Sequence, residues 1–301
     1  MTTLPSETDE PRSFELELPV RAGVPTTRRV VRGRVHGASL DGTPRAGVML
    51  VHGYLAFMDW AFLPALTERL VAAGFAVVTF NLSGSGVGPE LDDFTDPVGF
   101  AHNTYEQELE DVDAVTRALA DGRLGAIDTC RVGLWGHSRG SAMAVLHAAR
   151  ELDRGEKGIR YRALCTWASA AYVGRYEPQR LEEWRRNGHL WVQLADGRRL
   201  RLERDLLDDF ESRPTRLDVL AAAARLDVPV QLLQGERDRS VLESEAAELI
   251  DAYPEGRAKL EIVPSAGHNF GARHPLEKIP PQLETALAVT SEHFERYLSD
   301  D

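Results

Sequence analysis

Short apolar runs alternate with longer amphipathic stretches along most of the chain. Apolar runs bounded by turn residues are typical of buried strands, whereas apolar residues spaced three or four apart are typical of helices that cover one face of a core. The runs that we interpret as strands are 47–51, 76–80, 131–135, 162–168, 228–233 and 259–263. The stretches that we interpret as helices are 61–73, 103–120, 141–150, 242–252 and 281–298.

Two further runs near the N-terminus, 14–18 and 29–35, are interpreted as an antiparallel pair at one edge of the same sheet. The first of them alternates apolar and polar residues, as a half-buried strand does. Strands that alternate with helices favour a parallel sheet covered on both faces, because each helix carries the chain back across the sheet. The pattern therefore predicts an α/β protein with a mainly parallel, eight-stranded sheet.

The alternation is interrupted over residues 171–214. This segment contains charged, helix-like stretches and two alternating runs on either side of Asp-Gly at residues 196–197, which favours the tight turn of a β-hairpin. We therefore predict three regions: a disordered tail over 1–13, a core formed by 14–170 and 215–301, and a small lid or cap formed by the interrupting segment.

The chain has 301 residues and a formal net charge of −12. Nucleic acids and anionic membranes attract basic surfaces, so this charge argues against both as partners. Residues 1–11 lack the apolar segment of a secretion signal, and no apolar run reaches the ~20 residues that a membrane span needs. We expect a soluble, cytoplasmic protein whose two cysteines, Cys130 and Cys165, stay reduced.

A candidate nucleophile lies where the strand 131–135 should turn into the helix 141–150. Residues 136–140 read Gly-His-Ser-Arg-Gly, which is the G-x-S-x-G pattern of a nucleophile elbow. Glycines on both sides let the backbone fold tightly around Ser138 and lift its hydroxyl clear of the sheet. Because so short a pattern recurs by chance, the prediction depends on the strand before it and the alanine-rich helix after it.

A serine hydroxyl needs a base within hydrogen-bond reach, and the base needs an orienting carboxylate. Asp238 and His268 each follow a predicted strand, and the chain order serine, acid, histidine is the one expected after an elbow. A loop aspartate is more often a turn residue, Glu236 is a local competitor, and the chain has nine histidines. The joint placement at three strand ends nevertheless favours a triad of Ser138, His268 and Asp238.

Two backbone N–H groups beside the nucleophile are predicted to form an oxyanion hole. In an elbow, one donor is the residue after the nucleophile, here Arg139, and the other comes from an earlier loop, where Tyr54 is our choice. Because both donors are amides, the two side chains are free to shape the pocket. We interpret His52, in the same loop as Tyr54, and His137, which precedes the serine, as structural rather than catalytic.

Three patterns that suggest bound groups lack the required residues. Residues 83–89 resemble a dinucleotide-binding loop, but the third glycine of G-x-G-x-x-G would fall on Pro89. The Asp-Asp pairs at 92–93 and 208–209 lack a calcium-type ligand loop, and no spacing of histidines or cysteines suggests zinc. We therefore predict no cofactor and no metal.

Together these motifs resemble the α/β-hydrolase fold superfamily over about residues 14–298. His-Gly at 52–53 is similar to its oxyanion loop, 136–140 to its elbow, 235–238 to its acid loop and 267–268 to its histidine loop. Within the superfamily, the chain looks most like bacterial serine esterases of the cinnamoyl- and feruloyl-esterase type, and like the neighbouring dienelactone-hydrolase-like and serine-aminopeptidase-like groups. The resemblance implies the α/β-hydrolase fold.

Two features distinguish the chain within that superfamily. Residues 80–86 read Phe-Asn-Leu-Ser-Gly-Ser-Gly where many relatives have an Asp-x-Arg-Gly-x-Gly run, so the pairing partner of this loop stays open. A serine at position 138, where true dienelactone hydrolases use cysteine, argues against that activity.

The resemblance also implies that residues 171–214, inserted after the sixth strand, form a lid over the site. Large aromatic residues of this segment either line the substrate pocket or bury the lid against the core. The four that we predict to line the pocket are Tyr172, Tyr176, Trp184 and Trp191.

The predicted reaction is hydrolysis of a small-molecule carboxylic ester through an acyl-enzyme. Ser138 attacks the carbonyl, His268 acts first as general base and then as general acid, and Asp238 orients His268. A thioester or a peptide would react by the same chemistry, so these substrates remain alternatives. An inactive binding protein is a further alternative, but such proteins usually lack a triad member, and this chain has all three.

Overall fold

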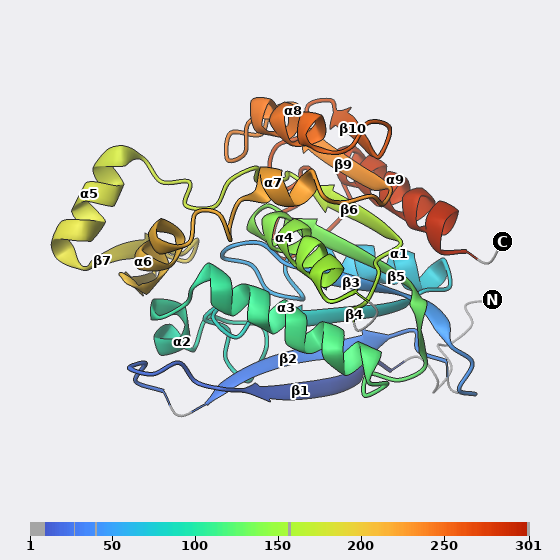
Figure 1. Ribbon diagram of the computed structural model, residues 1–301, viewed down its shortest axis with the longest axis horizontal. Coiled ribbons are helices and arrows are strands. Elements are labelled where there is room, and N and C mark those ends of the chain that lie inside the picture. The colour runs from blue at the N-terminus through green and yellow to red at the C-terminus, as the bar shows by residue number, and fades with distance from the viewer. Residues whose placement is uncertain (1–9, 27, 40, 156–157, 300–301) are drawn as a thin grey trace.

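The structure, a computed structural model, describes residues 10–26, 28–39, 41–155 and 158–299. Its centre is an eight-stranded sheet in the order β1-β2-β4-β3-β5-β6-β9-β10 (Figure 1). The strands of this sheet are β1 (Arg12–Leu18), β2 (Arg29–His36), β3 (Arg45–Val51), β4 (Ala76–Asn81), β5 (Ile127–His137), β6 (Ala163–Trp167), β9 (Val230–Gly235) and β10 (Ala258–Val263).

The pairs β4-β3, β3-β5, β5-β6, β6-β9 and β9-β10 are parallel, whereas β2 runs antiparallel to both β1 and β4. The predicted α/β class and the mainly parallel, eight-stranded sheet are therefore confirmed. Parallel strands align their carboxyl ends at one edge of the sheet, and the loops that leave this edge are where α/β proteins hold their sites.

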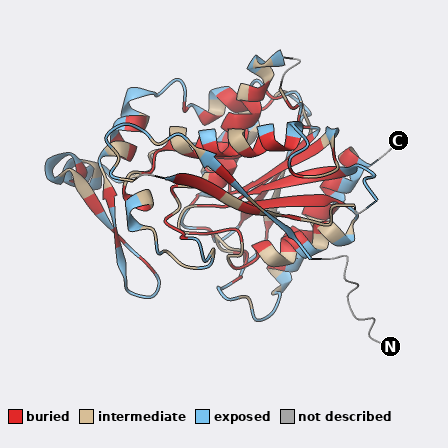
Figure 2. Cartoon of the chain, turned by 90° about the horizontal axis from the view of Figure 1, so that it is seen from below, coloured by how far each residue is buried: buried red, intermediate tan, exposed pale blue. Residues whose placement is uncertain are grey.

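Helices cover both faces of the sheet. Those packed around it are α1 (Leu63–Ala72), α3 (Tyr105–Ala120), α4 (Arg139–Asp153), α7 (Val219–Ala223), α8 (Glu243–Ala252) and α9 (Pro281–Leu298), and the short α2 (Pro97–Ala101) precedes α3 in the chain. Apolar residues of α1 and α9 form one core with the sheet, and those of α3, α4, α7 and α8 form the other. Figure 2 shows the central strands buried between these two layers.

The two central helices of the second layer follow from local sequence. In α3, the side chain of Thr104 accepts a hydrogen bond from the backbone of Gln107 and so satisfies one free N–H group of the first turn. In α4, the residues between Gly140 and Ala149 are all buried, and many of them are alanine. Small side chains let this helix approach β5 and α3 closely, which places the start of α4 near the middle of the carboxyl edge.

Residues 171–214 fold outside the eight-stranded sheet. They form α5 (Pro178–Asn187), a two-stranded hairpin of β7 (His189–Gln193) and β8 (Arg199–Glu203), and α6 (Asp205–Ser212). Gly197 has a positive φ of 91° in the turn, which explains the Asp-Gly pair there and confirms the predicted hairpin. In Figure 1, α5 and β7 stand apart from the layered core at the left of the molecule.

The N-terminal boundary needs a correction. The predicted tail of 1–13 includes Arg12 and Ser13, but both already pair with β2, opposite Val35 and Arg34. The alternation over 14–18 therefore marked only part of the strand, and residues 1–9 lie outside the described residues. Among the helices of the described part of the chain, none combines the length and the apolar character needed to cross a bilayer.

Candidate active site

Ser138 lies on a strained turn between β5 and α4. Its φ of 54° and ψ of −120° are unusual for a residue with a side chain. A Cβ atom added to Gly136 would lie 2.5 Å from the carbonyl oxygen of Gly140, and one added to Gly140 would lie 2.3 Å from that of Val51. Both glycines are thus required by close backbone contacts, and the backbone forms a tight strand-to-helix turn at the place where the motif predicted one.

His268 and Asp238 face each other across two neighbouring loops. The Nδ1 atom of His268 lies 2.8 Å from Oδ2 of Asp238, whose side chain is fully buried. The other carboxylate oxygen accepts hydrogen bonds from the backbone of Ser240 at 2.7 Å and of Val241 at 3.0 Å. This arrangement fixes the orientation of the imidazole ring and leaves Nε2 for a proton transfer.

The environment of Asp238 favours its ionised form. Burial opposes ionisation, but the hydrogen bond and charge interaction with His268, together with the two backbone donors, outweigh it. The pKa of Asp238 is therefore lowered below its ordinary value. A charged carboxylate can stabilise the positive charge that His268 acquires when it accepts a proton.

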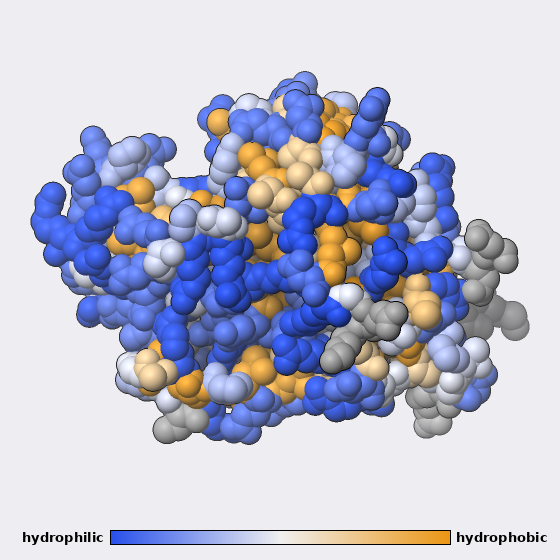
Figure 3. Space-filling model, in the orientation of Figure 1, coloured by the Kyte–Doolittle hydropathy of each residue, from blue (hydrophilic) through white to orange (hydrophobic). Residues whose placement is uncertain are grey.

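A cavity of about 530 Å³ brings these groups together, because Ser138 and His268 both line it. Its volume is in the range of small-molecule sites. Of the four aromatic residues predicted to line the pocket, Tyr172 and Tyr176 do so. Figure 3 shows a notch in the outline between the insertion, at the left, and the region of α8 at the top.

The prediction is wrong for the two tryptophans. Trp184 is the buried residue of α5 and packs its ring 5.1 Å from that of Tyr176, so it supports the cavity wall from behind. Trp191 is 48% exposed, because the alternation of β7 turns Leu190 and Val192 inward and the residue between them outward. Neither tryptophan lines the cavity.

The loop after β3 lies against the elbow, as an oxyanion loop should. A Cβ atom added to Gly53 would lie 3.3 Å from Cβ of Ser138, and Tyr54, the next residue, lines the same cavity as Ser138. His52 is buried, contacts the carbonyl of Gly53 through Nδ1 and accepts the backbone N–H of Leu82 at Nε2. Burial lowers its pKa to about 4, so His52 is neutral and holds two loops together.

His137 contacts the histidine loop rather than the cavity. Its Nε2 atom lies 3.0 Å from the carbonyl oxygen of His268, and the two rings are 4.8 Å apart. Burial lowers the pKa of His137 to about 3, so the ring is neutral. The interpretation of both His52 and His137 as structural agrees with these contacts.

The side chain of Arg139 forms a cluster that the sequence did not reveal. Its guanidinium lies 3.2 Å from Oε1 of Glu108 and stacks 3.9 Å from the centre of the Tyr54 ring and 4.9 Å from that of Tyr105. It also contacts the hydroxyl of Tyr176 at 3.4 Å. Arginine, tyrosines and serine all border the same cavity, and Glu108 lies behind them.

Burial and charge act in opposite directions within this cluster. Burial disfavours a charged guanidinium, but Tyr105 and Glu108 outweigh it and raise the pKa of Arg139 above its already high ordinary value. Burial raises the pKa of Glu108, and Arg139 offsets only part of this effect. The one available sequence signal was a charged residue on the apolar face of α3, four positions before Val112.

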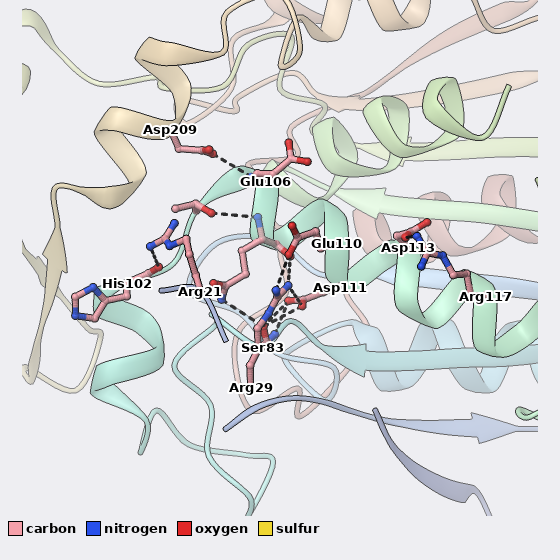
Figure 4. Close-up of polar contacts among 12 residues, drawn as sticks. Arg21, Arg29, Ser83, His102, Glu106, Glu110, Asp111, Asp113, Arg117 and Asp209 are labelled. Atoms are coloured by element: carbon pink, nitrogen blue, oxygen red, sulfur yellow. Dashed lines mark hydrogen bonds and ion pairs between the residues drawn. The ribbon is translucent and has the colours of Figure 1, made fainter. Parts of the chain in front are cut away.

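The partner of the loop over 80–86, left open by the sequence, is Asp111. Ser83 donates its backbone N–H to Oδ2 of Asp111 at 2.7 Å, and Arg29 of β2 binds Oδ1 at 2.6 Å (Figure 4). Arg29 also donates to the Ser83 hydroxyl at 3.0 Å. Arg29, which is distant from this loop in the sequence, thus holds the loop in place through Ser83 and Asp111.

One group of possible metal ligands occurs in the described part of the chain. The ligand atoms of Asp113, His147 and Glu151 lie within 4.8 Å of one another. However, Arg154 forms ion pairs with both carboxylates, and Nε2 of His147 is already bonded to Thr116 and Tyr161. These contacts fit an internal polar network at the far end of α4.

A sequence model described as the alpha/beta hydrolase family matches residues 48–279. No curated protein matches the chain. Among solved structures, a putative hydrolase from Agrobacterium vitis S4 is similar with a TM-score of 0.72 and 16% identity, covering 96% of this chain and 100% of that one.

Two structures with more specific names have the same fold. Est1E from Butyrivibrio proteoclasticus is similar with a TM-score of 0.63 and 16% identity, covering 95% of this chain and 99% of that one. A monoacylglycerol lipase from Paleococcus ferrophilus has a TM-score of 0.62 and 16% identity, covering 96% and 99%. Similarity at this level of identity concerns the fold alone.

Proposed function

The chain belongs to the alpha/beta hydrolase family, and we propose that it is a serine hydrolase that cleaves carboxylic esters of small molecules. The observation that carries this proposal is the shared cavity. It is lined by Ser138, on its strained turn, and by His268, whose ring is held by Asp238 at 2.8 Å.

The reaction proceeds in two halves. His268 takes the proton of the Ser138 hydroxyl while the oxygen attacks the ester carbonyl, and Asp238 stabilises the resulting imidazolium. The tetrahedral oxyanion accepts hydrogen bonds from the backbone N–H groups of Tyr54 and Arg139. The C–O bond to the alcohol then breaks, and the alcohol leaves with the proton held by His268.

The second half releases the acid. Water attacks the acyl-serine carbonyl and gives its proton to His268, and the second tetrahedral intermediate collapses to the carboxylic acid. Ser138 leaves with that proton, which restores the starting state. Arg139 is the first residue of α4, and its N–H has no partner within the helix because the first N–H groups of a helix never do.

An ester substrate is supported by the chemistry of the site and by its neighbours in fold space. The structures of similar fold include Est1E with ferulic acid bound and the monoacylglycerol lipase. Both names describe those proteins, and the shared fold is the reason to test esters first. Thioesters and peptides, which react through the same acyl-enzyme, belong in the same substrate panel.

The decisive experiment is the substitution Ser138→Ala. The wild-type protein should bind a fluorophosphonate probe covalently and hydrolyse short p-nitrophenyl esters. The variant should not be labelled, and its kcat should be lower by a factor of at least ~10³. The control variant is Ser85→Ala, which removes a serine hydroxyl from a loop outside the cavity. The proposal fails if ester turnover survives in the Ser138 variant.

A further inference from the structure

The arginine beside the nucleophile has unused hydrogen-bonding capacity. A guanidinium offers five N–H donors, and the contacts of Arg139 to other side chains are Glu108 at 3.2 Å and Tyr176 at 3.4 Å. Both distances are long for a charged donor, whose bonds to carboxylates are usually 2.7–2.9 Å. The guanidinium also stacks on Tyr54 and borders the cavity, so its N–H groups beyond these two contacts can serve a ligand there.

The tyrosines around it add further donors. The hydroxyl of Tyr54 is buried and has no hydrogen-bond partner among the described residues. The hydroxyl of Tyr105 accepts the backbone N–H of Gly174, and that of Tyr176 accepts from Arg139, so each keeps its own proton to donate. A wall of this kind is complementary to a ligand rich in acceptor oxygens.

The charge of the cavity differs from that of the whole chain. The protein has a net charge of −12, yet the charged side chains that line the cavity are three arginines and one glutamate. Arg175 is paired with Glu245, and Arg180 donates to the carbonyl of Trp191. Arg139 is the least exposed of the three, since its side chain is 12% exposed, that of Arg175 is 31% exposed, and Arg180 is exposed.

Resting on the esterase function proposed above, we infer that the preferred ester carries a second, negatively charged group, a carboxylate, and that Arg139 binds it. The guanidinium fork matches the two oxygens of a carboxylate, and the tyrosine hydroxyls can donate to the same oxygens. Glu108, on the opposite side, holds the arginine in position. Arg139 then has two separate roles: its backbone N–H faces the oxyanion, and its side chain selects the substrate.

The test uses pairs of esters in which one member carries the carboxylate and the other has a methyl group in its place. Monomethyl glutarate is compared with methyl pentanoate for the acyl side, and 4-acetoxybenzoate with 4-tolyl acetate for the alcohol side. Preference is the kcat/KM of the ester with the carboxylate divided by that of the ester with the methyl group, both measured by pH-stat. We expect the wild-type protein to prefer the carboxylate in at least one pair.

Variants then assign that preference. Arg139→Met should reduce the ratio by about tenfold or more, the factor for one charge-assisted hydrogen bond, and Arg139→Lys should restore part of it because the charge remains. Arg150→Met is the matched control, since Arg150 also joins α4 to a glutamate of α3, at 3.0 Å from Glu106, but lies outside the cavity. Its ratio should equal that of the wild type.

The outcomes separate this inference from the proposed function. If the serine is labelled and the esters of both pairs are hydrolysed without preference for the carboxylate, or if Arg139→Met keeps the wild-type ratio, the carboxylate inference is wrong and the esterase proposal stands. If neither labelling nor turnover occurs, the esterase proposal fails. Calorimetric titration of the Ser138→Ala variant with monomethyl glutarate then tests the carboxylate site at Arg139 without turnover. Binding that is abolished when Arg139→Met is added supports the site, and no binding, or binding that survives Arg139→Met, overturns it.

Discussion

A buried arginine, Arg29, and a partly buried one, Arg139, are held by carboxylates of the same helix, α3, and the two pairs are built differently. Arg29 is bonded to Asp111 at 2.6 Å, to Glu110 at 2.5 Å and to the Ser83 hydroxyl at 3.0 Å (Figure 4). Both oxygens of Asp111 also accept from Ser83. In this pair, nearly every donor and acceptor is used within the protein.

In the pair of Arg139 and Glu108, fewer of the donors and acceptors are hydrogen-bonded within the protein. One oxygen of Glu108 is bonded to Asn103 at 2.6 Å and to Arg139 at 3.2 Å, and the other has no partner among the described residues. Buried charges are costly unless their hydrogen bonds are satisfied. A saturated pair therefore fixes a loop, whereas an unsaturated pair that borders a cavity leaves donors for a ligand.

The largest expected effect is on the saturated pair. Arg29→Met leaves Asp111 buried without its cation, so the free energy of unfolding should fall by about 3–5 kcal/mol. Urea denaturation followed by circular dichroism measures this. A loss below about 1 kcal/mol would show that this pair does not hold the fold, and the contrast with Arg139 would disappear.

The unsaturated pair should contribute less to stability. Arg139→Met should lower the free energy of unfolding by only about 1–2 kcal/mol, because Glu108 keeps its bond to Asn103 and its raised pKa lets it take up a proton. Arg150→Met, at a partly exposed pair, should cost about 0.5 kcal/mol. Equal losses for the Arg29 and Arg139 variants would contradict the distinction between the two pairs.

An effect smaller than the loss of either Arg29 or Arg139 is a dependence of stability on pH. Burial raises the pKa of Asp111 to about 6, and the charge of Arg29 and the hydrogen bonds of Ser83 oppose that rise. A carboxyl that binds its proton more tightly when folded loses stability as pH rises through its folded pKa. Without Arg29 this pKa moves higher, so between pH 6 and pH 8 the variant should lose about 1 kcal/mol more than the wild type.

Denaturation of the wild type and of Arg29→Met at both pH values measures this difference. Above pH 6, Asp111 of the wild type is already ionised and contributes little further change. If the gap between the two proteins stays constant or narrows as the pH rises, Asp111 is not the group that Arg29 compensates.

Much of the fold and of the candidate site follows from patterns that are local in the sequence. Apolar runs determine which segments are buried strands, and Asp-Gly at 196–197 determines the hairpin turn. The glycines at 136 and 140 are required by the turn around Ser138. Asp238 and His268 could be expected to meet because each follows a strand, and parallel strands bring their carboxyl ends to one edge whatever the loops contain.

The contacts that distinguish this protein could not be read in the same way. The sequence left the loop of Ser83 without a partner, since Arg29 lies on β2, 54 residues before Ser83, and meets α3 only when β2 pairs with β4. It also treated Trp184 and Trp191 alike, although α5 buries the first and β7 exposes the second.

By itself, then, the sequence determined how the strands and helices of the core follow one another along the chain. It also determined the Gly-x-Ser-x-Gly turn and the three residues of the proposed triad, because all of these depend on periodicity and on spacing along the chain. Tertiary structure decided which side chains meet in space. Arg139 and its partners, Glu108 and three tyrosines, come from four different segments. Such a cluster forms only after α3, α4, the loop after β3 and the insertion have packed together.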